Sequence, residues 1–371
     1  MRLLITFLLA VFSGIAQNDS TLYSFFVAGH TYGNPGVNNK GFHPPFKDKF
    51  GYIQNRTEIK FGILTGDIVS PNPVAQDWDE VDADIALLGL PIYFAVGNHD
   101  MENRPLFESR YGSTYYDFIY KKDLFIVLDP NISGWSIKGI QLQYLKDLLD
   151  KKSISVDNIF VFFHQIIWRE SNNAFNHILF NSNAGRLSPV NFWTEIEPLF
   201  SKLSNDIVMF SGDVGVSWAS DVSFDIYNNI TFITTGMGDE DGENFVVVNV
   251  DTSKSLDYDL VCLSDPELKC LGDIEDYTVV NKTAGFNLLS YHNACRTTFN
   301  VNTYSKRLSI KSDSIERITI QLYDLQGKIV LKKYLEGNLQ HDIDVSNVSK
   351  GFYALKIIEN KECPAIRLIL E

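Results

Sequence analysis

The stretch that decides the fold runs from Ile92 to Asp100 and reads Ile-Tyr-Phe-Ala-Val-Gly-Asn-His-Asp. A continuous apolar run predicts a strand that is buried on both faces, because a half-exposed strand would alternate in polarity. The run ends at Gly97, which lets the chain turn sharply. Asn98, His99 and Asp100 are therefore expected at the carboxyl end of a buried strand, which is where α/β sheets place their binding sites.

Other apolar runs end in the same way, each in a residue of a type that binds metal ions. Strands are expected at Tyr23–Ala28, Ile59–Thr65, Ile159–Phe163 and Asp206–Ser211, and they are followed by Gly29-His30, Gly66-Asp67, His164 and Gly212-Asp213. Taken singly, a histidine after a strand is more often structural, and a Gly-Asp pair is usually a turn. Repeated five times in order, the pattern indicates one shared site.

The segments between these runs complete an α/β pattern. Further strands are expected at Leu124–Leu128, Ile230–Thr235 and Phe245–Val250, and helical spacing occurs from Val74 to Leu88, ended by Pro91, and from Ile140 to Leu149. The fold class is therefore an α/β sandwich over roughly the first 250 residues.

The order and spacing of the five sites resemble the calcineurin-like metallophosphoesterases, over roughly Leu22 to Val250. The motifs of that family are Asp-x-His, Gly-Asp, Gly-Asn-His-Asp/Glu, His and Gly-His-x-His, each after a strand. Gly97-Asn98-His99-Asp100 is the most specific match. The resemblance implies an α-β-β-α sandwich. It also implies paired divalent ions, about 3.5–4 Å apart, which neutralise a phosphate ester and activate a hydroxide.

The resemblance also implies roles for individual residues. His30 would bind the first metal, Asp67 would bridge both metals, and the second would be held by Asn98, His164 and Asp213. The expected catalytic residue is His99, placed near the leaving-group oxygen as a proton donor or as electrostatic support. The guanidinium groups of Arg104 and Arg169 are candidates for substrate binding because their planar fork suits phosphate; the alternative is ordinary surface charge.

Two positions depart from the family pattern, and both concern the first metal. Ala28 stands where the family has aspartate, and Asp213-Val214-Gly215 stands where it has His-x-His. The first site then keeps only His30 and Asp67, unless a carboxylate of the acidic segment 236–243, such as Asp239, is an additional ligand; otherwise that segment is a solvated loop. Replacing Ala28 by Asp and Gly215 by His is expected to restore the first ion, provided that the side chains fit.

The expected cofactors are one or two divalent ions per chain, drawn from manganese, magnesium, iron, zinc or calcium. An oxygen-rich ligand set suits manganese, magnesium or calcium better than zinc. The formal net charge of −14, from 32 Lys and Arg against 46 Asp and Glu, argues against binding to a nucleic-acid backbone. The expected substrate is a small phosphate ester.

The N-terminal residues have the features of an export signal. Residues 1–16 combine Arg2, an apolar run from Leu3 to Ile15 and small residues before Gln17, as in a cleaved signal peptide. The run is too short for a stable membrane span, which needs about 20 residues. Export permits disulfides, and Cys262 with Cys270 is the natural first pair; Cys295 and Cys363 are left, and three connectivities stay open.

The C-terminal part changes to short alternating strands. We expect the phosphoesterase domain at residues 17–260, a linker at 261–296 and a small all-β sandwich at 297–371, with strands at Arg307–Ile310, Ile318–Asp324, Lys328–Tyr334, Asp342–Val345, Gly351–Glu359 and Ala365–Leu370. The run from Tyr323 to Lys328 and the run from Ile343 to Tyr353 resemble the sorting domain of type IX secretion substrates. An accessory ligand-binding sandwich is the alternative.

Two functions follow from these patterns. The first is a metal-dependent phosphoesterase, exported through the periplasm and secreted or held at the cell surface, which hydrolyses a phosphomonoester or phosphodiester by metal-activated hydroxide. Its C-terminal domain would engage the secretion machinery. The second is a catalytically impaired protein of the same fold that binds a ligand with one metal or none.

Overall fold

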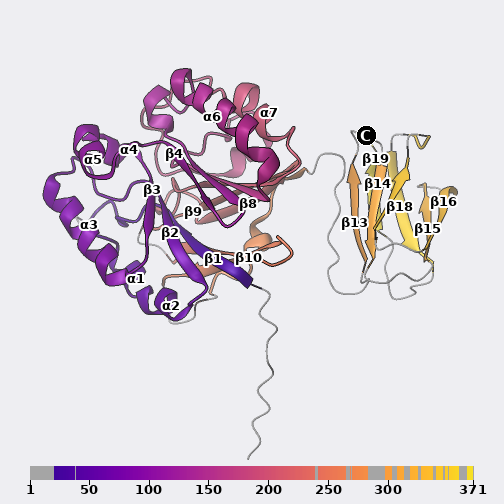
Figure 1. Ribbon diagram of the computed structural model, residues 1–371, viewed down its shortest axis with the longest axis horizontal. Coiled ribbons are helices and arrows are strands. Elements are labelled where there is room, and N and C mark those ends of the chain that lie inside the picture. The colour runs from indigo at the N-terminus through magenta and orange to yellow at the C-terminus, as the bar shows by residue number, and fades with distance from the viewer. Residues whose placement is uncertain are drawn as a thin grey trace, which may run out of the picture.

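The computed structural model describes residues 21–37, 39–238, 241–264, 268, 270–282, 297–302, 307–312, 318–324, 327–336, 340–345, 347–349, 351–358 and 366–370. Residues 21–282 contain two central β-sheets with helices outside them, and the C-terminal residues form further strands (Figure 1). In the described part of the chain, no helix has the length and apolar character needed to cross a membrane.

The two central sheets are mixed. The first has five strands in the order β11-β10-β1-β2-β3, and the second has seven in the order β12-β8-β9-β7-β6-β5-β4. In the first sheet β1, β2 and β3 are parallel, and in the second β5, β6, β7 and β9 are parallel. The strands are β1 Thr21–Ala28, β2 Ile59–Thr65, β3 Ile92–Ala95, β4 Tyr116–Tyr120, β5 Asp123–Val127, β6 Asn158–Phe162, β7 Asp206–Ser211, β8 Val222–Tyr227, β9 Ile230–Thr235, β10 Asn244–Asp251, β11 Leu256–Cys262 and β12 Asn281–Lys282.

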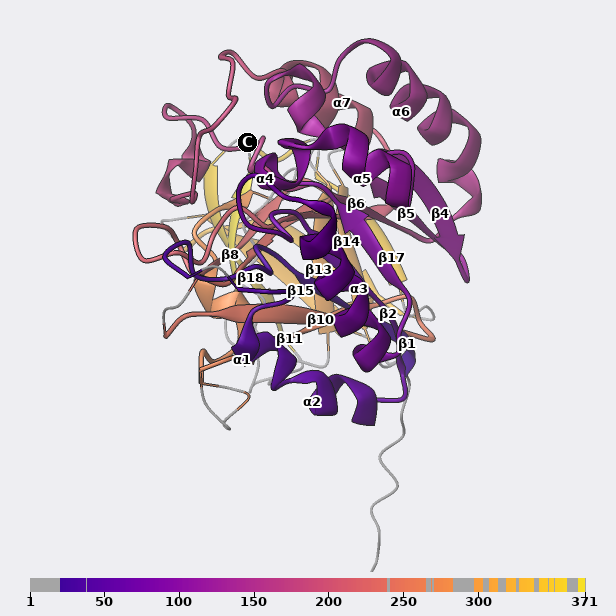
Figure 2. The same cartoon turned by 90° about the vertical axis from the view of Figure 1, so that its left-hand side faces the viewer.

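Helices cover the outer faces of both sheets. The α-helices are α1 Pro44–Lys47, α2 Phe50–Asn55, α3 Ala75–Leu88, α4 Asn98–Met101, α5 Arg104–Tyr111, α6 Gly139–Lys152 and α7 Glu197–Phe200, with shorter turns η1 Pro130–Ser133, η2 Ser153–Ser155, η3 Ala174–His177, η4 Phe192–Ile196 and η5 Ile274–Tyr277. Figure 2 shows the strands between α6 and α7 at the top and α1 and α2 at the bottom. The layers are those of an α-β-β-α sandwich.

The continuous apolar runs are explained by three separate cores. In β1, Tyr23, Phe25 and Val27 point into the core between the two sheets, whereas Phe26 and Ala28 point into the core under α1 to α5. A third core lies beneath α6, where Leu142, Leu145 and Leu149 are buried. Alternate residues of one strand thus enter two different cores, so apolar residues follow one another along the strand from Phe25 to Ala28.

Most ends of the predicted elements in this region are confirmed to within two residues. The end of helix α3 has a different cause from the one predicted. Helix α3 ends at Leu88 because Gly89 adopts the left-handed conformation, with φ of 71°, and its N–H bonds to the Ile85 carbonyl. Pro91 lies beyond this end and does not terminate the helix. The sequence prediction omitted α1, α2, α4 and α5 and the strands β4, β8 and β11.

The expected linker at 261–296 needs correction. Its described part, up to Lys282, belongs to the sandwich: β12 pairs with β8, and Ile274 is fully buried in the core between the sheets. The expected disulfide between Cys262 and Cys270 is present. Residues 283–296, which include Cys295, and Cys363 lie outside the described residues.

The C-terminal strands form two antiparallel sheets, β13-β14-β17 and β16-β15-β18-β19. Their bounds are β13 Thr297–Asn302, β14 Arg307–Ser312, β15 Ile318–Tyr323, β16 Ile329–Leu335, β17 Gln340–Asp344, β18 Gly351–Ile357 and β19 Ile366–Leu370. Buried Ile320 and Leu322 of β15 alternate with less buried neighbours, as expected for a sheet with one covered face. The predicted small all-β domain is confirmed.

Candidate metal centre

The predicted site residues come from the carboxyl ends of strands in both sheets. His30, Asp67 and Asn98 follow β1, β2 and β3 of the first sheet, while His164 and Asp213 follow β6 and β7 of the second. The first two have left-handed backbones, with φ of 55° at His30 and 47° at Asp67. This conformation is uncommon for residues other than glycine, and it tends to occur at functional sites.

Asp67 lies at the centre of this cluster. Its Oδ2 is 3.3 Å from Nε2 of His164, 3.4 Å from Nε2 of His99 and 4.0 Å from Nε2 of His30. Its Oδ1 accepts a hydrogen bond from the His99 backbone N–H at 3.0 Å. Burial alone would raise the pKa of Asp67, but the imidazoles, His164 foremost, outweigh burial and hold that pKa below its usual value.

Two histidines face Asp67 with Nε2. His30 Nδ1 is 2.7 Å from the carbonyl oxygen of Met237, and His164 Nδ1 is 2.8 Å from that of Thr65. A carbonyl oxygen only accepts hydrogen bonds, so each Nδ1 carries the proton and, in the neutral ring, each Nε2 keeps a lone pair. Hydrogen bonds of this kind fix the tautomer of metal-binding histidines. In the chain without metal, burial lowers the pKa of His30 to about 4.

Asp213 is the second carboxylate of the cluster and is fully buried. Its carboxylate oxygens and Nε2 of His164 make no hydrogen bond of good geometry, although the Ser182 backbone N–H lies close enough to lower the pKa of Asp213, and His164 Nε2 lies 3.7 Å from Asp213 Oδ1. Burial raises the pKa of Asp213 well above its usual value. Burial would lower the pKa of His164, but the Asp67 carboxylate outweighs it and raises that pKa to about 10. Without metal, a proton is therefore retained between these groups.

The donor set suits a divalent ion. Asp67, His164 and Asp213 face one another in a buried space, and such groups need a proton or a cation between them; without metal the proton is on Nε2 of His164. Within the described ranges, no group of three or more His, Cys, Asp or Glu side chains is already arranged to hold an ion. The side chains of Asp67, His164 and Asp213 would therefore have to move closer together when an ion binds.

The Gly-Asn-His-Asp segment is fixed against Asp67. An added Cβ at Gly97 would lie 2.1 Å from Asp67 Oδ1, so this close approach requires glycine. Asp100, which is fully buried, accepts hydrogen bonds from the N–H groups of Ile68, Val69 and Gly97. Burial, with Asp67 nearby, raises the pKa of Asp100 to about 6. Asn98, at the start of α4, forms no side-chain hydrogen bond with the described residues and is partly exposed.

The positions that depart from the family pattern supply no ligand for a first metal. Ala28 is buried among apolar residues of the core under α1 to α5. Gly215 has φ of 100°, and an added Cβ would lie 2.5 Å from the carbonyl carbon of Gly236. The expectation that histidine at position 215 would restore the first ion is therefore wrong, because that side chain does not fit. Asp239 lies outside the described residues.

Both candidate substrate-binding arginines already have partners. The guanidinium of Arg104 contacts buried Asp129 at 2.8 Å and Thr114 at 3.1 Å. Arg169 donates to the carbonyl of Ile178 and lies over the ring of Phe180, and burial lowers its pKa. Substrate contact by Arg104 and Arg169 stays a prediction.

Three further side chains support the site, of which the sequence offered His43 only as a candidate to line its mouth, Glu243 only as part of the acidic segment 236–243, and Tyr32 not at all. Tyr32 lies between two site histidines: its ring centroid is 4.4 Å from that of His30 and 5.5 Å from that of His99. Buried His43 and Glu243 contact each other at 2.8 Å, across 200 residues of sequence. Nothing in the sequence indicated that His43 and Glu243 form a pair.

Comparison with known protein families agrees with the fold and the motifs. Residues 30–182 match the calcineurin-like phosphoesterase family, and residues 302–371 match the secretion system C-terminal sorting domain. Neither match covers half of the chain, so each describes the part that it spans. The protein carries a metallophosphoesterase-type domain and a type IX sorting domain, and it is exported, to be secreted or held at the cell surface. No protein with a curated description matches it.

Several solved structures are similar to parts of this chain. A purple acid phosphatase from yellow lupin (Lupinus luteus) seeds is 15% identical, with a TM-score of 0.46 over 66% of this chain and 52% of that one. A putative 5'-nucleotidase from Staphylococcus aureus is 14% identical, with a TM-score of 0.38 over 65% of this chain and 53% of that one. The chain spans about half the length of these two proteins.

A third structure is similar to a shorter part of the chain. It is a DUF3244 family protein with an immunoglobulin-like β-sandwich from Bacteroides vulgatus, 19% identical, with a TM-score of 0.19 over 22% of this chain and 88% of that one. At these identities and scores, none of the three assigns an activity to this protein.

Proposed function

We propose that this protein is an exported, metal-dependent phosphoester hydrolase whose tighter ion is held by Asp67, Asn98, His164 and Asp213. The observation that supports it most is the group of buried polar atoms around Asp67, because Nε2 of His164 and both oxygens of Asp213 make no hydrogen bond of good geometry. A fold that keeps these groups facing one another incurs a desolvation penalty, which a bound cation offsets.

Each residue of the site would have a separate role in hydrolysis. A divalent ion neutralises charge on a phosphate ester and makes water a better nucleophile near neutral pH. Asp67 supplies negative charge at the centre, and the carbonyls of Met237 and Thr65 keep His30 and His164 in the ligand tautomer. His99, whose side chain is 19% exposed, would give a proton to the leaving group.

A second ion is expected to bind more weakly. Only His30 and Asp67 remain for it, because Ala28 and Gly215 offer no donor, and affinity falls with the number of ligands. The same observation favours the alternative function, a binding protein of this fold that holds one ion or none and does not hydrolyse its ligand.

Metal content and turnover distinguish the two functions. We expect one tightly bound ion by elemental analysis and, in manganese, hydrolysis of p-nitrophenyl phosphate or bis(p-nitrophenyl) phosphate. Asp67→Ala should remove all metal and activity, whereas His30→Ala should remove only the weaker ion. Asp123→Ala is the matched control, because that carboxylate is equally buried and bonds to Tyr23 and Asn158, away from the cluster. One ion or none, without turnover, would favour the binding protein.

A further inference from the structure

A single peptide group connects a buried carboxylate to His30. The carbonyl oxygen of Met237 lies 2.7 Å from His30 Nδ1, and the N–H of the same peptide, at Gly238, donates to Glu243 Oε1 at 2.9 Å. Both side chains are almost fully buried, with 2% of His30 and 3% of Glu243 exposed. The contacts thus run from the Glu243 carboxylate through the peptide to the imidazole of His30. The other ring nitrogen of His30, Nε2, faces Asp67.

Glu243 is held from its other side by His43. Nε2 of His43 lies 2.8 Å from Glu243 Oε1, although the two atoms are not aligned as a hydrogen bond. The side-chain nitrogen of Asn39 donates to the Tyr32 carbonyl and lies 3.3 Å from His43 Nδ1. Because an amide nitrogen only donates, Nδ1 of His43 accepts, and the ring proton lies on Nε2, next to the carboxylate.

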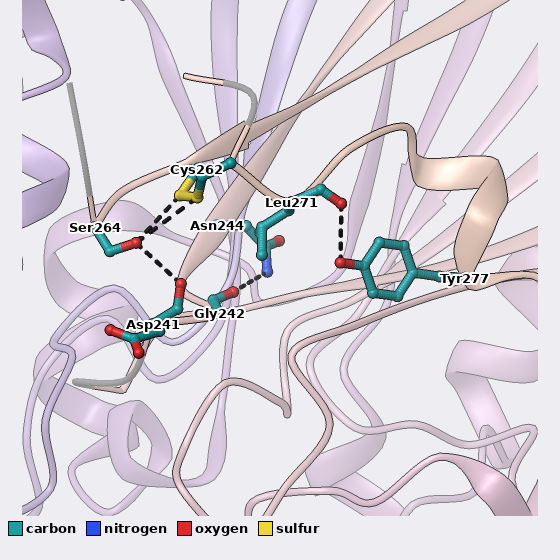
Figure 3. The surroundings of a disulfide bond; sticks show 8 residues. Asp241, Gly242, Asn244, Cys262, Ser264, Leu271 and Tyr277 are labelled. Carbon is teal, nitrogen blue, oxygen red and sulfur yellow. Dashed lines mark hydrogen bonds between the residues drawn. A yellow bond between two sulfur atoms is a disulfide. The ribbon is translucent and has the colours of Figure 1, made fainter. Parts of the chain in front are cut away.

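The main chain around Glu243 is fixed by its neighbour β11. The Leu263 N–H donates to the Glu243 carbonyl at 2.9 Å, and the Ser264 hydroxyl donates to the Asp241 carbonyl at 3.0 Å. The disulfide between Cys262 and Cys270 lies directly beside these contacts (Figure 3). The disulfide and these hydrogen bonds therefore hold the main chain of Glu243 in place beside the Met237–Gly238 peptide.

We propose that Glu243 is a positioning residue for His30 and acts through the Met237–Gly238 peptide. The proposal rests on the proposed function in one respect, namely that His30 is a metal ligand. A carboxylate that accepts from the N–H side polarises the peptide and makes its carbonyl a stronger acceptor. The proton of His30 is thereby kept on Nδ1, and the lone pair on Nε2 points at Asp67. Metal sites use the same arrangement without the intervening peptide.

The first test reads the tautomer of His30 in the metal-free protein. With ¹⁵N-labelled histidine at one fixed pH above neutral, two-dimensional spectra distinguish Nδ1–H from Nε2–H rings, and His30→Asn identifies the signal among seven histidines. We expect Nδ1–H in the native chain, a mixture in Glu243→Ala and Nδ1–H again in Glu243→Gln, whose amide oxygen can accept from Gly238. Asp241→Ala, which removes an exposed charge from the same loop, should leave the signal unchanged.

The second test measures affinity for the weaker ion by titration with manganese. Glu243→Ala should weaken it about 10–100-fold, the usual effect of removing a group that orients a ligand. An unchanged tautomer with unchanged affinity in Glu243→Ala would overturn the proposal. If that variant does not fold, Glu243→Met, which has a similar length but no oxygen to accept from the Gly238 N–H, takes its place, and an unchanged tautomer with unchanged affinity there would overturn the proposal. A changed tautomer in a chain that binds no metal would support the positioning role and refute the proposed function.

Discussion

His99 is the imidazole of the cluster that a substrate can reach most easily. Its side chain is 19% exposed, against 2% for His30 and none for His164. Its Nε2 is 3.4 Å from Asp67 Oδ2, its Nδ1 is 3.5 Å from Glu102, and the Tyr32 ring packs against it edge-on. Carboxylates on both sides thus orient the His99 ring, which is not one of the proposed metal ligands.

His99→Ala should lower turnover by about 10²–10⁴-fold, the usual contribution of a general acid or base. Metal content should change little, because His164 and Asp213 stay in place. Steady-state kinetics with p-nitrophenyl phosphate and elemental analysis of the same sample measure both quantities. Undiminished turnover would show that another group protonates the leaving group.

Single residues of the site were predictable where they follow strands. His30, Asp67, His164 and Asp213 each come directly after an apolar run, and the strand ends bring them together. Glu243 and His43 were not predictable as a pair, because they are distant in sequence and meet only after β1 and β10 pair. The misfit of histidine at position 215 depends on the approach of Gly236, which no local pattern reveals.

At the scale of elements, β3 is an edge strand whose exposed backbone is covered by one side chain. The hydroxyl of Tyr116 accepts from the N–H of Phe94 and donates to its carbonyl, both at 3.0 Å. Strand β4, which carries Tyr116, belongs to the other sheet, so this hydroxyl also joins the two sheets at their edges. Unpaired edge groups are otherwise free to pair with another chain.

Tyr116→Phe should lower the free energy of unfolding by about 1–3 kcal/mol, because two backbone groups of Phe94 lose their partner. Urea unfolding followed by fluorescence measures this loss. Tyr115→Phe is the control, since the hydroxyl of Tyr115 makes no hydrogen bond with the described residues. Equal stability of both variants and the native chain would mean that water replaces the hydroxyl without cost.

Long buried elements were predicted well and short or edge elements poorly. Strands β2, β7 and β9 have the predicted bounds, because both of their faces are apolar. Helices of four to eight residues, such as α1, α4 and α5, are too short to show a helical period. Strands β8 and β11 carry aspartates among their apolar residues, and these interrupt the pattern that marks a strand.

For the molecule as a whole, the disulfide ties β11 to the segment that follows it. Cys262 and Cys270 are separated by eight residues, and closing so short a loop is expected to stabilise the folded chain by about 2–3 kcal/mol in the chain-entropy model. The double variant Cys262→Ser, Cys270→Ser should lose this amount in urea unfolding. Adding reductant should destabilise the native chain and leave the double variant unchanged; an equal response of both would assign the effect to other cysteines.

Export should remove residues from both ends of the protein. We expect it to begin at or near Gln17 and to lack the sorting domain matched at residues 302–371, since signal peptides are removed on export and the sorting domain serves secretion. Mass spectrometry of the secreted protein measures both ends. An exported chain that still begins at Met1, or that keeps its C-terminal domain, would contradict the corresponding cleavage.

The division of the proposed ligands between two sheets would have a thermodynamic consequence. Asp67 belongs to the first sheet and His164 and Asp213 to the second, so the three groups are neighbours only while the sandwich is closed. An ion that needs all of them binds the folded chain alone, and by mass action free metal at a thousand times the dissociation constant adds about 4 kcal/mol to folding stability. The mineral content of the surroundings would then govern how long the exported protein resists unfolding and proteolysis.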